Sequence, residues 1–384
     1  MKIFVTNDNA GSAFAMVPAL LRLKSEGVEI VAFAEEVAPA FAVFKKAGFE
    51  PMAPRAPLGL DSMAAIINRE KPDLIFVGVS DVDNGSEKMA IQVAAGASIP
   101  MVAIVESWPH KWLQNFASRD IPLYQKADAI LVVDGIAKRK MVEAGFSSEQ
   151  IVVTGNPGND DLPVLRKELP RYRREMREKL GLSEEDFVFV YLLTNDLDND
   201  EKWREEERNL RKEIGSLDPE WLGFQEKSVV KEFFAAVRDA RHPNVEFRAL
   251  IRQKRGYGRN KLDAVIKKFN PRAVVDTDGY LQGRATMLAA DVVIGTTTLM
   301  METAAFLGLP TVSYLPGVSI EKDPKPTNHL GITMPVREWG GLDKLIRSIA
   351  EQPAAVRELV RNKEALLPED ATGNVADFLR HFVV

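Results

Sequence analysis

Apolar residues along this chain come in short runs, separated by longer segments in which they recur every three or four positions. In the first part of the chain the runs are 2–6, 29–34, 73–79, 100–106, 129–134 and 151–155. The segments between them are 13–27, 37–48, 60–71, 86–97 and 135–145. The runs do not alternate with polar residues, which is typical of strands covered on both faces. Strands that alternate with helices in this way predict a parallel α/β sheet.

The pattern is interrupted at NPGNDDLP (156–163), whose Pro, Gly, Asn and Asp content predicts a loop. A second series of strands follows at 186–193, 244–251, 273–277, 291–296 and 310–315. We therefore predict an α/β fold of two Rossmann-like, doubly wound domains, residues 1–160 and 161–371. The amphipathic segment 372–384 is predicted to be a helix that packs back on the first domain.

Residues 195–227 form a charged insert where a short strand-to-helix loop is expected. We favour a solvated helical excursion. The alternative is a lid or an oligomer contact, because Trp203, Trp221 and Phe224 supply apolar anchors.

The composition and charge of the chain exclude several classes of protein. The 384 residues suffice for two domains, and the net charge of -5 gives no global field for nucleic acid. There is no cysteine, which excludes disulfides, thiol nucleophiles and cysteine-ligated metals. The N-terminus lacks a signal-peptide pattern, and no apolar run approaches the roughly 18 residues of a spanning helix. These features favour a cytoplasmic protein.

The segment GTTTLMMETAAFLGLPTVSY (295–314) carries one charge, Glu302, behind three threonines. If Thr298 is the N-cap of a helix, Glu302 lies on a face that is not plainly solvated. Hydroxyls and N–H groups at a helix start suit a diphosphate, and a carboxylate one turn on can accept hydrogen bonds from a ribose diol. The alternative is a threonine cap with Glu302 in a structural salt bridge.

Here the sequence resembles the GT-B superfamily, which includes glycosyltransferases and UDP-N-acetylglucosamine 2-epimerases. The similarity lies in ADVVIGTTTLMMETAAFLGLPTVSY (290–314), in PDLIFVGVSDVDNGSEKMAIQVAAGASIPMVAIVES (72–107) and in the V-T-G-N-P of residues 153–157. RREMREKLGLSEEDFVFVYLL (173–193) resembles the usual entry into the second domain. The resemblance implies two domains that face a cleft, with a nucleotide-sugar donor bound mainly to the second.

For that second domain, the resemblance implies that Thr296, Thr297 and Thr298 hold the diphosphate and that Glu302 holds the ribose. Two further pairs are implied. Arg252 and Lys254, after strand 244–251, neutralise phosphate charge, with a solvated basic loop as the alternative. Gly279 and Tyr280 frame the base.

The first domain is expected to hold the acceptor and the catalytic groups. Gly11 and Ser12, in the loop NDNAGSAF (7–14), can approach the diphosphate closely, although an ordinary capped turn explains them equally well. Glu106 and Asp81 follow strands and are candidate acid–base groups, although Glu106 can instead be a structural carboxylate that holds the turn after it. His110, in ESWPHKW, is a further candidate base or phosphate contact.

Three departures from the epimerases affect the expected reaction. The first loop, 6–16, has no Arg or Lys, a Glu-rich segment is replaced by residues 116–129, and a Gly-Gly pair is replaced by threonines. We therefore rank transfer of a sugar from a nucleotide-diphosphate sugar, a UDP-sugar by preference, to a sugar or lipid-linked acceptor first. An NDP-sugar 2-epimerase or hydrolase is the first alternative, and a non-catalytic binding protein the second.

No cofactor or metal is expected. Asp196, Asp198 and Asp200 have the spacing of a calcium loop, but Glu201 stands where that loop needs glycine. The basic segment 166–179 has two interpretations. We favour a solvated helix over a face for anionic membranes.

Overall fold

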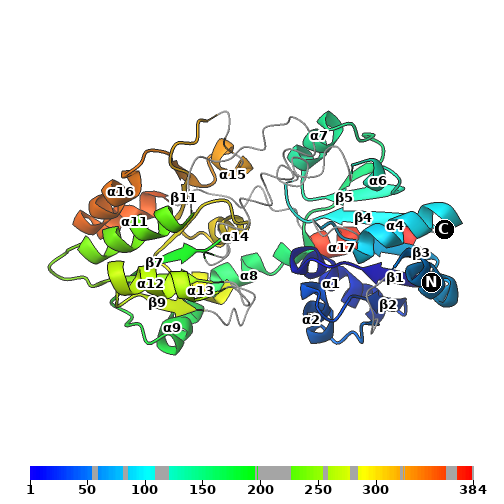
Figure 1. Cartoon of the computed structure of the whole chain (residues 1–384), viewed down its shortest axis with the longest axis horizontal. Helices are drawn as coiled ribbons and strands as arrows, with labels where there is room; N and C mark the ends of the chain where they lie inside the picture. The colour runs from blue at the N-terminus through cyan, green and yellow to red at the C-terminus, as the bar shows by residue number, and fades with distance from the viewer. Residues whose placement is uncertain are drawn as a thin grey trace. The chain divides into compact units, whose positions relative to one another are not determined.

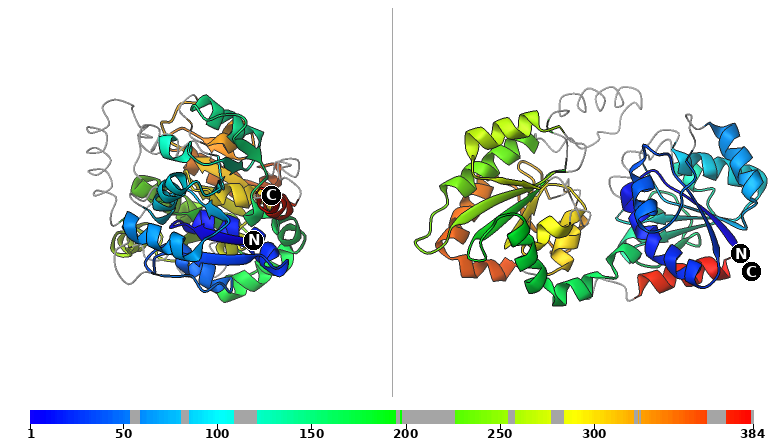
Figure 2. Two further views of the ribbon diagram at one scale, coloured as in Figure 1. Left: turned by 90° about the vertical axis from the view of Figure 1, so that its right-hand side faces the viewer. Right: turned by 90° about the horizontal axis from the view of Figure 1, so that it is seen from below.

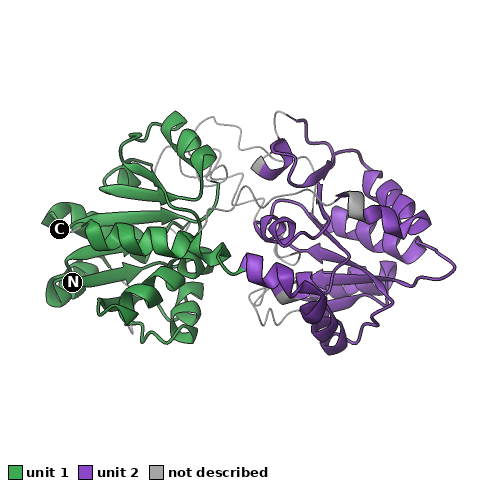
Figure 3. Ribbon diagram, turned by 180° about the vertical axis from the view of Figure 1, so that it is seen from behind, with its two compact units in different colours: residues 1–161, 367–384 green, residues 162–366 purple. Residues whose placement is uncertain are grey.

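The computed structural model describes residues 1–53, 59–80, 85–108, 121–194, 197, 226–253, 258–276, 284–320, 323, 325–359 and 370–382. The chain divides into two compact units. Unit 1 comprises residues 1–161 and 367–384, and unit 2 comprises residues 162–366 (Figure 3).

Unit 1 contains a six-stranded parallel sheet. Its strands are β1 (Lys2–Thr6), β2 (Glu29–Phe33), β3 (Leu74–Val77), β4 (Met101–Val105), β5 (Ala129–Val132) and β6 (Ile151–Val153). Its helices are α1 (Ala10–Ser25), α2 (Pro39–Lys46), α3 (Leu60–Glu70), α4 (Ser86–Ala97), α6 (Ile121–Tyr124), α7 (Gly135–Glu143) and α17 (Ala371–His381), with a short 3₁₀ helix, η1 (Pro157–Asn159).

Unit 2 contains a second six-stranded parallel sheet (Figure 1). Its strands are β7 (Phe187–Leu192), β8 (Phe247–Arg252), β9 (Val274–Asp276), β10 (Val292–Gly295), β11 (Thr311–Tyr314) and β12 (Met334–Val336). Its helical elements are α8 (Leu162–Lys167), α9 (Leu169–Lys179), α11 (Glu226–Asp239), α12 (Asn260–Phe269), α13 (Arg284–Leu288), α14 (Met300–Phe306), α15 (Pro326–His329), α16 (Gly341–Glu351) and the 3₁₀ helix η2 (Pro353–Leu359).

Both sheets are doubly wound, and helices flank them on both faces (Figure 2). Every residue of β3, β4 and β7 is buried, which explains why these strands are apolar without alternation. The predicted α/β class, with two parallel sheets, is confirmed. The structure also contains β12, which the sequence pattern did not predict because this strand has three residues and contains Pro335. Proline is tolerated there because β12 is an edge strand.

The strand orders identify where each sheet can bind a ligand. Unit 2 has the order β12-β11-β10-β7-β8-β9, so the order in which strands are added to the sheet reverses between β7 and β10. Unit 1 has the order β2-β1-β3-β4-β5-β6, with its reversal between β1 and β3. In open α/β sheets, ligands bind outside the carboxyl ends of the strands at this switch point.

The C-terminal helix α17 belongs to unit 1. It lies beside α1 (Figures 1 and 2). Its residues Val375, Ala376 and Leu379 enter the core cluster that also contains Ile3 and Phe76. Because these three positions are spaced one and then three residues apart, they occupy one face of the helix.

The basic segment 166–179 forms α8 and α9, and part of its charge is used inside unit 2. Arg177 is 3% exposed and donates to the carbonyls of Glu184, Asp186 and Ala289 and to the carboxylate of Asp291. Arg173 shares Asp291. These two guanidiniums therefore have a structural role. Among the residues that the structure describes, no helix is long and apolar enough to cross a membrane.

Candidate functional site

The switch point of unit 2 is lined by threonine hydroxyls. Thr194 follows β7 and Thr296 follows β10, and their Oγ1 atoms are 2.9 Å apart. Ser313 Oγ, on the neighbouring β11, donates to the carbonyl of Thr296 at 3.3 Å. The hydroxyl of Thr296 is therefore engaged with the adjacent strand, and the turn that follows it is fixed at the point where a ligand is expected.

The turn Thr296–Thr298 leads into α14, whose N-cap is Leu299 and not Thr298. Thr298 still acts in the cap, because its Oγ1 accepts a hydrogen bond from the N–H of Met300 at 3.4 Å. Glu302 is thereby the third residue of the helix. Its side chain is 11% exposed, as its apolar neighbours suggest.

Glu302 has a cationic partner that the sequence did not identify. Lys325 is 0% exposed, and its Nζ lies 3.3 Å from Glu302 Oε1. The same ammonium donates to the carbonyl of Thr298 at 3.1 Å and to that of Thr297 at 3.4 Å. One buried cation therefore holds both the turn and the carboxylate.

A polar network keeps Lys325 in place. Asp323 Oδ1 accepts the N–H of Lys325 at 2.9 Å, and the same carboxylate accepts from Asn328 Nδ2 and from Arg337. Asn328 Nδ2 also donates to Ser313 Oγ at 3.1 Å. The network connects the loop before α15 with β11, and so with the threonine turn.

Arg252 is the last residue of β8 and pairs in register with Leu192 of β7, which pairs in turn with Gly295 of β10. Arg252 is therefore two strands from the threonine turn, about 10 Å in backbone spacing. Lys254, Gly279 and Tyr280 lie outside the described residues.

In unit 1 the structure brings three of the predicted residues together. Gly11 and Ser12 form the first turn of α1, and Ser12 Oγ lies 2.9 Å from Glu106 Oε2, just beyond β4. A Cβ atom on Gly11 would be 3.1 Å from Glu106 Oε1, so the glycine leaves room for the carboxyl group. Asn9 is the N-cap of this helix and accepts the N–H of Gly11.

Burial raises the pKa of the Glu106 carboxyl, against hydrogen bonds from its own backbone and from Ser12 that lower it. The Ser12 hydroxyl has a single hydrogen, and Val79 O is a second acceptor for it at 3.0 Å. When Ser12 donates to Val79, a protonated Glu106 can donate to Ser12. The pair can therefore hold a proton in either of two arrangements.

The backbone around Glu106 is braced from two other loops. Asn156 Nδ2, in the V-T-G-N-P turn, donates to the Glu106 carbonyl at 2.8 Å. The indole of Trp108 donates to Asp134, the N-cap of α7, at 2.9 Å. Two other loops thus fix the backbone of the segment that carries the Glu106 carboxyl group.

A second acidic cluster lies at the unit 1 switch point. Asp8, after β1, accepts the backbone N–H and the hydroxyl of Ser86 at the start of α4, both at 2.8 Å. Glu87 accepts from Ser80, after β3. Burial and the charge of Asp8 raise the pKa of Glu87 to about 7, against smaller lowering contributions that include Ser80 and Lys88. This cluster can store a proton near neutral pH.

Sequence reasoning missed Asp8, Glu87 and Lys325. Asp8 sits at a strand end, which was the available signal, while Glu87 has the ordinary pattern of an acidic first turn. Lys325 carries no local signal, because its partner lies in another element. Asp81 and His110, the other predicted catalytic residues, lie outside the described residues.

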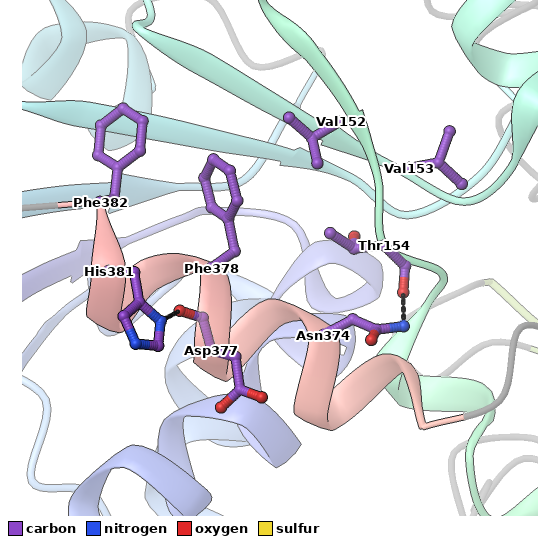
Figure 4. Close-up of a pocket in the computed structure, with 8 residues that line it drawn as sticks. All are labelled: Val152, Val153, Thr154, Asn374, Asp377, Phe378, His381 and Phe382. Carbon is purple, nitrogen blue, oxygen red and sulfur yellow. Dashed lines mark hydrogen bonds between the residues drawn. The ribbon is translucent and has the colours of Figure 1, made fainter.

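Unit 1 also has a hollow of about 510 Å³ between β6 and α17, lined by Val152, Val153, Thr154, Asn374, Asp377, Phe378, His381 and Phe382 (Figure 4). Asn374 donates to the carbonyl of Thr154 across it. None of its lining residues belongs to the Glu106 or Asp8 clusters.

No protein-family model and no curated protein matches the chain by sequence. Solved structures match it along its whole length. MnaA of S. aureus, solved with UDP, is 15% identical with a TM-score of 0.69, and the match covers 100% of this chain and 96% of that one. UDP-GlcNAc 2-epimerase of Neisseria meningitidis, bound to UDP-GlcNAc, is 13% identical with a TM-score of 0.67, covering 99% and 100%.

Anabaena HepE, in complex with UDP and glucose, is 16% identical with a TM-score of 0.61, and the match covers 99% of each chain. These similarities, together with the two doubly wound parallel sheets, show that the chain has the GT-B fold.

Proposed function

We propose that this protein is an enzyme that acts on a nucleoside diphosphate sugar, with a UDP-sugar as the preferred substrate. The carrying observation is the unit 2 switch point, where a threonine turn and the Glu302–Lys325 pair adjoin the strand ends at which such sheets bind ligands. Similar structures were solved with UDP or UDP-GlcNAc.

In this proposal the turn Thr296–Thr298 contacts the diphosphate and Glu302 accepts hydrogen bonds from the ribose hydroxyls. Arg252 contributes positive charge from β8. The chemical step belongs to unit 1, where Glu106 exchanges a proton with the sugar. Gly11 and Ser12 support that carboxyl group, and a ligand oxygen can replace Ser12 as its partner.

Among the possible reactions, we place the epimerase or hydrolase type first. The chain matches the Neisseria UDP-GlcNAc 2-epimerase with a higher TM-score, 0.67, than HepE, 0.61. Inversion at a sugar carbon also requires a proton to leave and return, and a buried carboxyl group with a raised pKa is suited to that exchange.

Glycosyl transfer, ranked first from the sequence, is the second candidate. An epimerase that removes the nucleotide from the sugar is helped by charged groups around that sugar. The first loop, 6–16, has no Arg or Lys, which favours transfer. The similarity to HepE, solved with UDP and glucose, also keeps this reaction open.

The test is incubation of the purified protein with UDP-GlcNAc in D₂O, without an acceptor, followed by NMR. Deuterium at C2 of the sugar, with a second epimer, supports the epimerase. Free UDP that forms only when a sugar acceptor is added supports transfer, and free UDP with free sugar supports hydrolysis. If no UDP-sugar binds or reacts, the proposal is wrong.

A further inference from the structure

Lys325 is the most completely buried cation of unit 2 whose contacts the structure describes, and its setting differs from that of a residue that touches a ligand. An ammonium group has three N–H donors and no acceptor. The carbonyls of Thr297 and Thr298 and the carboxylate of Glu302 supply three acceptors, all within 3.4 Å. Its donors are thus matched inside the protein, so any effect of Lys325 on a ligand must pass through these groups.

The first route is through the peptide groups of the turn. In a trans peptide the C=O and the N–H point in opposite directions. Because the carbonyls of Thr297 and Thr298 are directed at the ammonium, the N–H groups of Thr298 and Leu299 are directed away from it. The buried charge also polarises both peptides, which makes these N–H groups better donors to an anion.

The second route is through Glu302. A buried carboxylate is costly unless a cation compensates its charge, and Lys325 is that cation at 3.3 Å. An ionised carboxylate only accepts hydrogen bonds, which fits the two hydroxyls of a vicinal diol as donors. The contact with Lys325 also restricts the rotamers of Glu302, so less conformational entropy is lost when a ligand binds.

We propose that Lys325 is a positioning residue that fixes Glu302 and the threonine turn, and that it thereby determines a preference for ribonucleotides over 2′-deoxyribonucleotides. The proposal rests on the nucleotide-sugar function proposed above. It goes beyond that function because it assigns substrate selectivity to a residue that does not touch the substrate.

The experiment measures the affinities of UDP and 2′-deoxy-UDP by calorimetry for the wild type and Lys325→Met. We expect the wild type to prefer UDP by roughly tenfold or more, because a hydrogen bond to a charged group is lost in the deoxy compound. In Lys325→Met we expect weaker UDP binding and a ratio of the two affinities close to one. Lys344→Met is the matched control, since Lys344 is 75% exposed in its pair with Glu338, and its ratio should equal that of the wild type.

Circular dichroism establishes that each variant is folded. If Lys325→Met does not fold, Lys325→Arg is measured instead. Arginine keeps the positive charge, but its guanidinium is a planar fork, whereas an ammonium reaches the three acceptors in three directions. The ratio of the UDP and 2′-deoxy-UDP affinities should therefore fall between one and the wild-type value.

The outcomes separate the two proposals. If the wild type binds UDP but does not discriminate against 2′-deoxy-UDP, or if the folded Lys325 variant keeps the wild-type ratio, the role of Lys325 is overturned while the nucleotide site stands. If the wild type binds neither compound, both proposals fail together.

Discussion

The two units place carboxyl groups at the same edge of similar sheets but give them opposite surroundings. Glu302 of unit 2 lies against the ammonium of Lys325, whereas Glu106 and Glu87 of unit 1 lie against the hydroxyls of Ser12 and Ser80. A cation keeps a carboxylate charged, while a hydroxyl can accept a hydrogen bond as well as donate one, so it can partner a carboxyl group in either protonation state. In the proposed function, unit 2 therefore holds fixed charge and unit 1 moves a proton.

This contrast agrees with a division of labour in a nucleotide-sugar enzyme. Binding a diphosphate and a ribose requires groups that do not change their protonation state, whereas acid–base chemistry requires a group whose pKa is near the working pH. The raised pKa values of Glu87 and Glu106 agree with the requirement for acid–base groups. The buried Lys325–Glu302 pair agrees with the requirement for binding groups of fixed charge.

The largest expected effect tests whether the two carboxyl groups have different functions. The variants Glu106→Gln and Glu302→Gln make this test. We expect Glu106→Gln to lower kcat by roughly 10²–10⁴-fold, the range of a general acid–base group, with little change in UDP affinity. We expect Glu302→Gln to weaken UDP binding while kcat at saturating donor changes less. Steady-state kinetics with UDP-GlcNAc and calorimetry with UDP give the two numbers, and equal effects on both quantities in both variants would contradict the division.

Much of the fold that places these carboxyl groups could be predicted from the sequence. The non-alternating apolar runs predict the strands of both sheets except β12 to within a few residues, because burial on both faces leaves a strong local signature. The threonine turn and Glu302 stood out as polar residues in an apolar run. Lys325 did not stand out in the sequence, because it comes into contact with Glu302 only when β11 lies beside β10 in the folded sheet. The pairing of Glu87 with Asp8 is hidden in the same way, since 78 residues separate Asp8 from Ser86, which adjoins Glu87.

The second prediction concerns the pH dependence of stability that Glu87 produces. Its folded pKa is about 7, above the usual 4.5, so below pH 4.5 its contribution is fully present and is lost as the pH rises through 7. That pKa difference corresponds to on the order of 3 kcal/mol. We expect Glu87→Gln, which mimics the neutral carboxyl group, to remove this part of the decline.

Urea unfolding between pH 4 and 8, followed by circular dichroism, measures the effect as the difference in unfolding free energy between the variant and the wild type. Glu351→Gln, at an exposed position of α16, is the control and should leave the wild-type profile unchanged. Parallel pH profiles for Glu87→Gln and the wild type would show that folding does not raise the pKa of Glu87, and the proton-holding character proposed for unit 1 would rest on Glu106 alone.

The smallest expected effect tests how closely the Glu106 site is fitted. Gly11→Ala puts a Cβ atom 3.1 Å from Glu106 Oε1, whereas Gly96→Ala in α4 meets nothing within 4 Å. Both glycines are helical, so each substitution should by itself stabilise the protein by about 0.5–1 kcal/mol. We expect Gly96→Ala to show that gain with unchanged turnover, and Gly11→Ala to lose the gain and turn over more slowly because the carboxyl group must shift. Thermal unfolding and kcat with UDP-GlcNAc measure both, and identical behaviour of the two variants would mean that the room beside Glu106 has no part in catalysis.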